Sequence, residues 1–507
     1  MSTAAFGQSL PPFRAANSTW MMYQGAAYLT GLQLLKGAVA GPNVKCTDDS
    51  LGRVAIGDPL VADINGDGLN EIVILTSGMQ IYAFRGTDCS IIWSRPVQGS
   101  YTPAIGDLNP SIPGLEIVVG YIMGGIYALS GTDGSEIWSD DYLYAYSPPS
   151  IADVDGDGFA EVFISTGYTL DAIYALRGTD GSIIWSRPIG GTYGNIAIGD
   201  INNDGDYELV TFANGGVLVL RATDGSTLWH YYTGSFGEVS LGDLDNDGYL
   251  EVVANVNLYV PDSVFPPTDS MKVYVLRNNG VLYWSKTLLG GASMGNINSP
   301  TIGDINGDGI LDVVFGTYDY HEMAGYVYGL RGNDGNPILY ESIGISPNDS
   351  VPSIKLGDID NDGGVEVVIA NRELRVSGEW IDSSDYFKGL SIADVDNDGC
   401  SEIIATTRFM SPFTFYVFDS PTPVSSCGTL GYGEAFGNKP SHIRFSVMAV
   451  KGGVIVETDK AYDIGVYNTS GKLIRVVKVS GRGFINLDAG VYIVGVKGVY
   501  KTAVVKP

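Results

Sequence analysis

The sequence predicts an all-β protein, an eight-bladed β-propeller followed by a small C-terminal β-sandwich. An acidic loop recurs eight times between apolar runs. Each recurrence carries four short strand candidates, which is the content of one propeller blade. Of the 507 residues 45% are apolar and 68 are Gly, and the apolar runs are short and interrupted by Gly, Pro, Asn or Asp. These features indicate strands and turns rather than helices.

The acidic loop is nine residues long, and seven copies have acids or Asn at positions 1, 3, 5 and 9 and a Gly at position 6. Successive copies start 44, 46, 47, 43, 61, 54 and 36 residues apart, a period typical of propeller blades. Seven blades are the alternative count, but seven would leave one loop without a blade. The copies begin at Asp63, Asp107, Asp153, Asp200, Asp243, Asp304, Asp358 and Asp394.

A second repeat interleaves with the first and ends in an aromatic residue. Its first copy runs from Ile81 to Trp93 and contains a polar turn between two apolar runs; most copies have Asp-Gly or Asn-Gly in this turn. Such turns predict β-hairpins, so this repeat supplies the third and fourth strands of each blade. We expect the aromatic residues to pack between blades rather than to stack on a ligand. They are Trp93, Trp138, Trp185, Trp229, Trp284, Tyr340 and Trp380.

The eighth unit, which begins at Asp394, lacks a Trp in a fourth strand. The segment from Asn17 to Gly25, which contains Trp20, resembles the fourth-strand sequence around Trp229. We therefore expect the N-terminal segment to complete the last blade and close the ring, which removes free sheet edges.

The predicted boundaries follow changes in composition. Residues 1–50 form an N-terminal arm with the ring-closing strand, and residues 51–420 form the propeller. Residues 421–439 are rich in Pro, Ser and Gly and are predicted to be a linker. Residues 440–507 alternate apolar and polar side chains, which predicts a β-sandwich.

The chemistry of the acidic loop favours calcium. Oxygen ligands at positions 1, 3, 5 and 9, with a Gly at position 6, suit a hard cation of flexible coordination. Without a cation, up to four carboxylates within nine residues would repel one another. The loops contain 28 of the 57 acidic residues, and the remaining 29 match the 29 Lys and Arg, so the net charge of −28 comes from the loops. No basic stripe is present, which argues against a nucleic-acid partner.

The loop and its flanking strands resemble the FG-GAP and VCBS repeats, known from integrin α-chain propellers and many secreted bacterial and archaeal proteins. The resemblance covers roughly residues 50–420. It implies about seven Ca²⁺ sites, each with side-chain ligands at positions 1, 3, 5 and 9 and a backbone carbonyl ligand at position 7. The implied ligands are Asp63, Asn65, Asp67, Leu69 and Glu71; Asp153, Asp155, Asp157, Phe159 and Glu161; Asp200, Asn202, Asp204, Asp206 and Glu208; Asp243, Asp245, Asp247, Tyr249 and Glu251; Asp304, Asn306, Asp308, Ile310 and Asp312; Asp358, Asp360, Asp362, Gly364 and Glu366; and Asp394, Asp396, Asp398, Cys400 and Glu402.

The second loop departs from this pattern. It starts at Asp107, has Ser111 at position 5, contains two prolines, and places Glu116 one residue late. We expect its calcium site to be lost or weak.

Two further resemblances concern other parts of the chain. The repeat ending in Trp is similar to the tryptophan-docking repeat of pyrroloquinoline-quinone dehydrogenases, which implies blade architecture only. No unrepeated acidic cluster or adjacent cysteine pair is visible, so we do not expect a quinone cofactor. Residues 440–507 resemble the sorting domains of type IX secretion cargo, and related sandwich modules also serve as structural or anchoring domains.

The four cysteines form two local groups, Cys46 with Cys89 and Cys400 with Cys427. Each group is either a disulfide of an oxidising compartment or a pair of buried thiols, and the sequence leaves both open. With three histidines and no CxxC motif, zinc is not expected. No apolar run is long enough to span a membrane, and no secretory signal is visible in residues 1–40.

These observations predict a non-catalytic, extracellular or cell-surface protein stabilised by calcium. It would act in adhesion, as a cell-surface layer or as a filament subunit, and its expected partners are copies of itself, surface proteins or glycans. The alternative is a lyase-like enzyme or a lectin acting on polysaccharide. Tyr318 to Glu322 is the most enzyme-like cluster, and the insertions Tyr259–Ser270 and Tyr318–Ala324 are candidate binding surfaces.

Overall fold

A computed structural model describes most of residues 43–419. The gaps are 168–169, 191–193, 235, 259–269, 290–298, 320–323, 346–352, 371–373, 377–378, 383–386 and 408–412. It also describes residues 32, 33, 37, 39 and 427 and the strands between residues 445 and 505. The chain divides into two compact units, Met1–Gly437 and Asn438–Pro507. In the described part of the chain no helix is present, and so none of a length and hydropathy suited to crossing a membrane.

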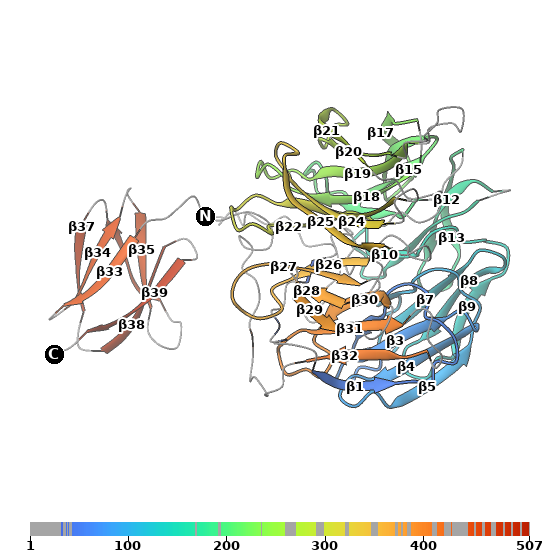
Figure 1. Cartoon of the computed structure of the whole chain (residues 1–507), viewed down its shortest axis with the longest axis horizontal. Coiled ribbons are helices and arrows are strands. Elements are labelled where there is room, and N and C mark those ends of the chain that lie inside the picture. The colour runs from blue at the N-terminus through green and yellow to red at the C-terminus, as the bar shows by residue number, and fades with distance from the viewer. Residues whose placement is uncertain are drawn as a thin grey trace. The chain divides into compact units, whose positions relative to one another are not determined.

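The first unit consists of eight four-stranded antiparallel sheets (Figure 1). In seven of them the four strands follow one another along the chain. The first three of these sheets are β2 (Leu60–Ala62), β3 (Glu71–Thr76), β4 (Gln80–Arg85) and β5 (Ile91–Pro96); β6 (Ala104–Gly106), β7 (Glu116–Tyr121), β8 (Gly125–Ser130) and β9 (Glu136–Asp140); and β10 (Ser150–Ala152), β11 (Glu161–Ser165), β12 (Ala172–Arg177) and β13 (Ile183–Pro188).

Four more sheets repeat the same order. They are β14 (Ala197–Gly199), β15 (Glu208–Ala213), β16 (Gly216–Arg221) and β17 (Thr227–Tyr232); β18 (Gly237–Gly242), β19 (Glu251–Leu258), β20 (Ser270–Leu276) and β21 (Leu282–Leu289); β22 (Thr301–Gly303), β23 (Asp312–Asp319), β24 (Ala324–Arg331) and β25 (Pro337–Ile345); and β26 (Ser353–Gly357), β27 (Glu366–Ala370), β28 (Leu374–Val376) and β29 (Glu379–Asp382). The seven predicted aromatic markers all lie in fourth strands, as expected.

The eighth sheet joins the two ends of the unit. Its strands are β30 (Phe387–Ala393), β31 (Glu402–Thr407), β32 (Phe415–Phe418) and β1 (Val44–Asp48), and β1 pairs antiparallel with β32 (Figure 1). The N-terminal part of the chain therefore supplies the fourth strand, but through residues 44–48. The prediction that the segment from Asn17 to Gly25 takes this place is wrong for the position beside β32, and that segment itself lies outside the described residues.

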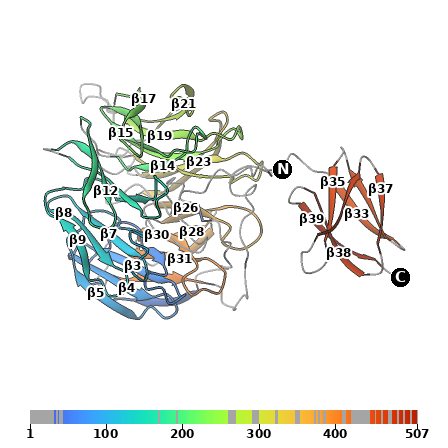
Figure 2. The same ribbon diagram turned by 180° about the vertical axis from the view of Figure 1, so that it is seen from behind.

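Neighbouring sheets contact one another through their first strands, from β2 and β6 onward to β26 and β30. Two of these strands, β26 and β30, are labelled in Figure 2. The eighth sheet also reaches the first: Leu390 N donates to Asp58 Oδ1 over 3.2 Å, and Ser391 Oγ donates to the Pro59 carbonyl over 2.5 Å. One hydrophobic cluster contains Ile72 of the first sheet together with Val417 of the last. These contacts confirm the predicted all-β propeller.

The tryptophans of the fourth strands connect each sheet to the next. The indole Nε1 of Trp138 donates to the Gly178 carbonyl over 2.6 Å, and a Cβ atom on Gly181 would lie 2.6 Å from the Trp138 ring. Gly181 has φ +71°, a conformation that favours glycine. The predicted packing between blades is confirmed for five of the seven aromatic residues, the tryptophans of the first five sheets. Tyr340 instead contacts Tyr326 and Tyr328 of its own sheet, and the side chain of Trp380 lies outside the described residues. The other indole donations are Trp93 to Gly131, Trp185 to Ala222, Trp229 to Asn278 and Trp284 to Gly332.

A disulfide replaces this connection where the ring closes. Trp93 pairs with Ala83 of its third strand, and Cys46 of β1 takes the same place opposite Val417 of β32. Cys89, with φ 59°, stands in the turn where the other sheets have the glycine that faces a Trp. The disulfide between Cys46 and Cys89 therefore takes the place of the contact that a Trp ring makes with the turn glycine of the next sheet.

The second unit contains two antiparallel sheets, which contact each other through β33 and β39. Cys427, in the segment between β32 and β33, forms a disulfide with Cys400 of the eighth acidic loop. The strands are β33 (Phe445–Val450), β34 (Gly453–Thr458) and β37 (Arg482–Asn486) in one sheet, and β36 (Leu473–Val479), β35 (Tyr462–Tyr467), β38 (Gly490–Val496) and β39 (Val499–Val505) in the other.

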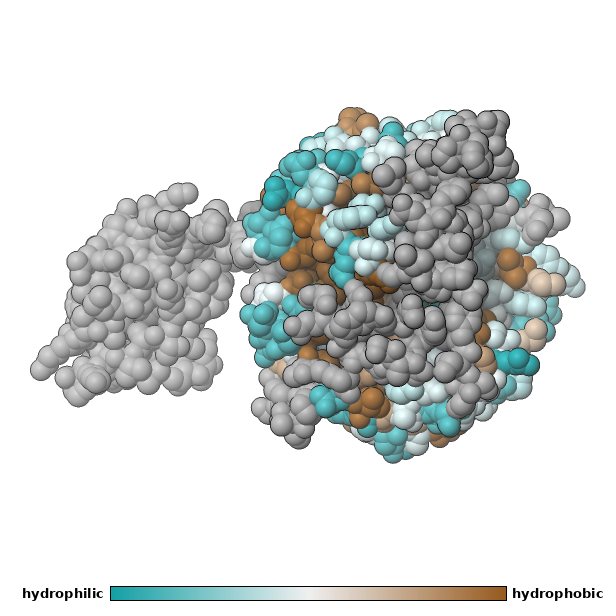
Figure 3. Space-filling view, viewed as in Figure 1, coloured by the Kyte–Doolittle hydropathy of each residue, from teal (hydrophilic) through white to brown (hydrophobic). Residues whose placement is uncertain are grey.

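The described surface of the first unit carries apolar and polar residues intermixed at its periphery, brown and teal in Figure 3. Several large apolar side chains of fourth strands are exposed, among them Ile183 at 52%, Tyr232 at 72% and Tyr340 at 62%. The outer strands are thus the least buried part of each sheet.

We predict that removing the closing disulfide destabilises the first unit. The double variant Cys46→Ser/Cys89→Ser should lower the free energy of unfolding by up to about 4 kcal/mol, because a loop of this length loses less entropy on folding when it is already cross-linked. Denaturant unfolding followed by Trp fluorescence measures the change. Cys400→Ser/Cys427→Ser is the control, since that bond joins no two sheets. Loop entropy alone destabilises the two variants by similar amounts, because the disulfides close loops with sequence separations of 43 and 27. A role in ring closure requires a clearly larger loss for Cys46→Ser/Cys89→Ser, and a loss no larger than that of the control would contradict it.

Candidate metal centres

Each acidic loop connects the first and second strands of its sheet and folds around its own backbone amides. In the first loop Gly68 N donates to Asp63 Oδ2 over 2.8 Å, and Ile64 N donates to Glu71 Oε2 over 3.0 Å. The carboxylates at positions 1 and 9 are therefore oriented by the loop itself. The same two bonds recur in the loops that start at Asp153, Asp200, Asp243, Asp304, Asp358 and Asp394.

Position 4 of the loop requires a left-handed backbone and also connects neighbouring loops. Four loops have Asn there, with φ between 56° and 64°, and three have Gly. Asn246 Nδ2 donates to the Gly309 carbonyl of the next loop over 3.0 Å. Asn397 likewise reaches Gly68 of the first loop over 3.3 Å, so the loops of the last and first sheets are joined.

In four loops the predicted ligands at positions 1, 3 and 9 converge. One carboxylate oxygen from each of the three residues lies within 4.8 Å of the others. This separation is compatible with a single ion bound by oxygens at 2.3–2.6 Å. The four groups are Asp153, Asp155 and Glu161; Asp243, Asp245 and Glu251; Asp358, Asp360 and Glu366; and Asp394, Asp396 and Glu402.

The other four loops, including the divergent second loop, have Asn at position 3. In the first, Asn65 Nδ2 donates to Glu71 Oε1 over 3.0 Å, and Asn65 Oδ1 accepts from Asp67 N over 2.8 Å. Asn306 makes the same kind of bond to Asp312 in the sixth loop. The amide thus neutralises no charge, but it provides a hydrogen-bond partner for the position-9 carboxylate.

Several buried carboxylate oxygens in these loops have no hydrogen-bond partner. Among the described residues they include Glu251 Oε1, Glu402 Oε1 and Asp312 Oδ1 at position 9, and Asp394 Oδ1 at position 1. These side chains are at most 4% exposed. A buried carboxylate oxygen without a partner is costly, and a bound cation is the group that would satisfy several at once. The residues present therefore fit calcium.

Burial raises the pKa of the position-9 carboxyls. It raises the pKa of Glu71 and Glu161 to about 7 and that of Glu251 to about 8, against an ordinary value of 4.5. Hydrogen bonds from the loop amides oppose the shift, and the neighbouring carboxylates add to it. For Glu402 burial, with Asp396, Asp419 and Asp394 nearby, raises the pKa to about 10. Without a cation these groups favour the protonated form.

The second loop keeps part of this arrangement. Leu108 N donates to Glu116 Oε2 over 2.7 Å, as in the intact loops. Among the described residues its acids form no group of three, because Asn109 and Ser111 stand at positions 3 and 5. Loss of its calcium site remains a prediction.

The position-7 residues were predicted to contribute only carbonyl oxygens, and their side chains point to solvent where they are large. Leu69 is 39% exposed, Phe159 36% and Tyr249 41%. These side chains therefore take no part in the loop core.

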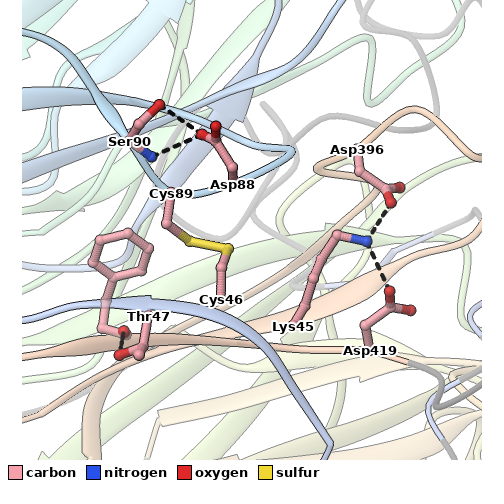
Figure 4. The surroundings of a disulfide bond; sticks show 9 residues. Lys45, Cys46, Thr47, Asp88, Cys89, Ser90, Asp396 and Asp419 are labelled. Atoms are coloured by element: carbon pink, nitrogen blue, oxygen red, sulfur yellow. Dashed lines mark hydrogen bonds and ion pairs between the residues drawn. A yellow bond between two sulfur atoms is a disulfide. The ribbon is translucent and has the colours of Figure 1, made fainter.

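Sequence reasoning missed the basic side chains beside the loops. Arg277, at the end of β20, lies 3.0 Å from Asp245 Oδ2, and Arg331, at the end of β24, lies 3.3 Å from Asp308 Oδ2. The signal was present, since the third-strand repeat ends in Arg in most copies. Lys45 of β1 contacts Asp396 of the eighth loop, and no local pattern could have indicated this contact (Figure 4).

The predicted enzyme-like cluster, Tyr318 to Glu322, lies largely outside the described residues. Residues 320–323 and the side chains of Tyr318 and Asp319 lie outside the described part of the chain, as do residues 259–269 of the first insertion.

Two family models match parts of the chain. An FG-GAP-like repeat matches residues 243–315, which contain the fifth and sixth acidic loops. The model described as outer membrane protein assembly factor BamB matches residues 36–201. These matches support a β-propeller repeat family, and both lie before residue 316, so the resemblance of the C-terminal unit to sorting domains stays a prediction. A search of curated proteins finds no match.

Solved structures share the architecture at low identity. Quinohemoprotein alcohol dehydrogenase from Comamonas testosteroni is 13% identical with a TM-score of 0.58, over 83% of this chain and 84% of that one. Alcohol dehydrogenase ADHIIG from Pseudomonas putida HK5 is 11% identical with a TM-score of 0.53, over 80% and 82%. BamB from Moraxella catarrhalis is 11% identical with a TM-score of 0.44, over 71% of this chain and 95% of that one.

These neighbours correct one prediction. The expectation that the chain is not an enzyme is contradicted, because the two solved structures above that share its fold are quinohemoprotein alcohol dehydrogenases, which are enzymes. At 11–13% identity the likeness shows the fold alone and assigns no reaction.

We predict that the protein becomes less stable as pH rises when calcium is removed. Burial raises the folded pKa of Glu71 to about 7 and of Glu251 to about 8, whereas the unfolded chain releases these protons near 4.5. Between those values the folded state binds more protons, so stability is greatest at low pH and is lost as pH rises towards 8. Melting curves in chelator from pH 5 to 8 measure the trend.

The control variant is Glu251→Gln, which cannot ionise at this position. Its melting temperature in chelator should fall less between pH 5 and 8 than that of the wild type. A wild-type melting temperature that rises over this range would contradict the burial of uncompensated carboxyls.

Proposed function

We propose that the protein is a calcium-stabilised propeller scaffold that acts outside the cytoplasm, in adhesion or in self-assembly at the cell surface. The observation that carries the proposal is the set of buried carboxylate oxygens without partners, such as Glu251 Oε1 and Glu402 Oε1, inside loops of converging acids. Calcium would supply the positive charge that these loops lack.

The loop backbone would orient the ion ligands, and hydrogen bonds between loops would transmit the ordering caused by calcium to neighbouring loops. Loop amides hold the carboxylates at positions 1 and 9, as Gly248 N and Leu244 N do for Asp243 and Glu251. Because Asn246 joins this loop to the Gly309 carbonyl, ordering one loop also orders its neighbour. We propose that the eight sheets are eight blades of one ring, so that calcium stabilises the whole circle.

The location outside the cytoplasm is supported by the cysteines. Both predicted groups form disulfides, and every cysteine is paired. Disulfides persist in oxidising compartments, which in the extracellular case also contain abundant calcium. Exposed apolar side chains on fourth strands, such as Tyr232 and Tyr340, suit contact with a second copy or another surface protein.

We predict that calcium raises the melting temperature and that chelation lowers it, since a ligand that binds only the folded state stabilises it. Calorimetric titration of the full chain should give more than four ions per chain, with the loop at Asp107 not among them. Asp155→Asn/Glu161→Gln should remove one ion from the count and leave the others. A melting curve unchanged by excess chelator would overturn the proposal.

Self-assembly is tested on the same samples. Sedimentation velocity with and without calcium should show larger species only when calcium is present. A monomer under both conditions would remove self-association from the proposed function and leave adhesion to another surface.

A catalytic function is the second candidate, favoured by a polar cluster among the first strands. Glu238 of β18 accepts from Asn195 N over 3.1 Å, and Asn195 Nδ2 donates to Ser299 Oγ over 2.9 Å. Burial raises the pKa of Glu238 to about 8. For Tyr101, burial and then the nearby Tyr146 and Glu238 raise the pKa to about 12. A partly buried carboxyl with a pKa raised to about 8 is suited to general acid–base work.

We predict that Glu238→Gln leaves the calcium count unchanged and abolishes any turnover found for the purified protein. Dye-linked alcohol oxidation and polysaccharide cleavage are the two assays. Activity that survives the substitution would exclude Glu238 as an acid or base.

A further inference from the structure

Lys45 links the ring-closing strand to the eighth acidic loop. Its Nζ contacts Asp396 Oδ2 and lies 2.8 Å from Asp419 Oδ2 (Figure 4). The side chains of Lys45, Asp396 and Asp419 are 19%, 16% and 16% exposed, so both ion pairs are partly buried but still reached by solvent. Asp396 is a position-3 ligand of the predicted calcium site, whereas Asp419 follows β32 and lies outside the loop.

The strand register shows that the basic residue at the eighth loop comes from β1 and not from the third strand of its sheet. In four other sheets the residue opposite the position-9 acid is Arg, as Arg85 opposite Glu71 and Arg331 opposite Asp312. In the second sheet it is Ser130, opposite Glu116. In the eighth sheet Ile403 pairs with Phe418, which places Asp419 opposite Glu402. In the eighth sheet the residue at this register position is therefore an acid, whereas in those four sheets it is Arg. The positive charge comes instead from β1, about 350 residues away in sequence.

We propose that Lys45 is a tethered cation that shares the eighth acidic loop with Ca²⁺. It binds Asp396 when calcium is absent and is displaced onto Asp419 alone when calcium binds. This inference rests on the proposed function, because it concerns one of the calcium loops.

The geometry supports an exchange between the two cations. Oxygens of Asp394, Asp396 and Glu402 lie within 4.8 Å of one another, and Lys45 contacts only one of these three residues. Glu402 is 0% exposed, and its Oε1 has no partner, so the ammonium group leaves the deepest ligand unsatisfied. A divalent ion at the centre would contact all three. Asp419 then remains as the partner of Lys45.

Two consequences follow for this loop. Calcium must displace a positive charge, so the eighth loop should bind it more weakly than the third loop, which contains Asp153, Asp155 and Glu161. Without calcium, Lys45 still connects β1 to the loop, so the closing strand stays attached by a polar contact in addition to its pairing with β32.

The test is calorimetric calcium titration of the full chain and of Lys45→Met, which keeps the length of the side chain without its charge. The variant should bind calcium at one site roughly tenfold more tightly than the wild type, because a competing charge is removed. Its melting temperature in chelator should fall below that of the wild type. Lys272→Met is the matched control, since Lys272 lies over the Tyr274 ring and contacts no acidic loop among the described residues.

The double variant Asp394→Asn/Glu402→Gln identifies the site. In that background Lys45→Met should leave the titration unchanged, since the eighth loop no longer binds calcium. Calcium binding by the wild type with no gain from Lys45→Met, or a gain that persists in the double variant, would overturn the inference but leave the proposed function standing. A wild type that binds no calcium would overturn both.

Discussion

Repulsion among carboxylates is the interaction on which this structure depends. Each acidic loop collects up to four acids, and its backbone amides point the acids at positions 1 and 9 inward. Without a cation, the loop can remain folded only by protonating a carboxyl, as the raised pKa of Glu251 indicates, or by drawing a base towards it, as Arg277 and Lys45 show. The loops therefore need a proton, a basic side chain or a cation to offset the charge of their carboxylates.

The apolar core and the aromatic connections between sheets are independent of that requirement. Trp138 and Gly178 belong to consecutive sheets, and their bond needs no ion. The propeller thus has two sets of connections between neighbours, a hydrophobic one through the tryptophans and a polar one through the acidic loops. Under the proposed function, only the polar set would respond to calcium.

Much of this could be predicted from the sequence because both repeats are local. The acidic loop, the turn and the aromatic fourth strand each occupy fewer than fifteen residues, so their period predicts sheets, hairpins and ligand positions. What could not be predicted is non-local. The closing strand was placed near Trp20 because that segment looks like a Trp-bearing fourth strand, but the observed strand contains Cys46. The sequence grouped Cys46 with Cys89 as a possible disulfide, but it did not indicate that this bond takes the place of a tryptophan contact between sheets. Lys45 was missed for the same reason, since its partner Asp396 lies at the other end of the unit.

The position of Cys89 affects the order in which the ring can close. Cys46 and Cys89 are only 43 residues apart, whereas Thr47 and its partner Phe415 are 368 apart. Loop-closure entropy grows with the logarithm of length, so fixing β1 through the short loop costs about 2 kcal/mol less than fixing it through the long one. Once the disulfide forms, it holds β1 beside the first sheet. Strand β32 then pairs with a strand that is already in position.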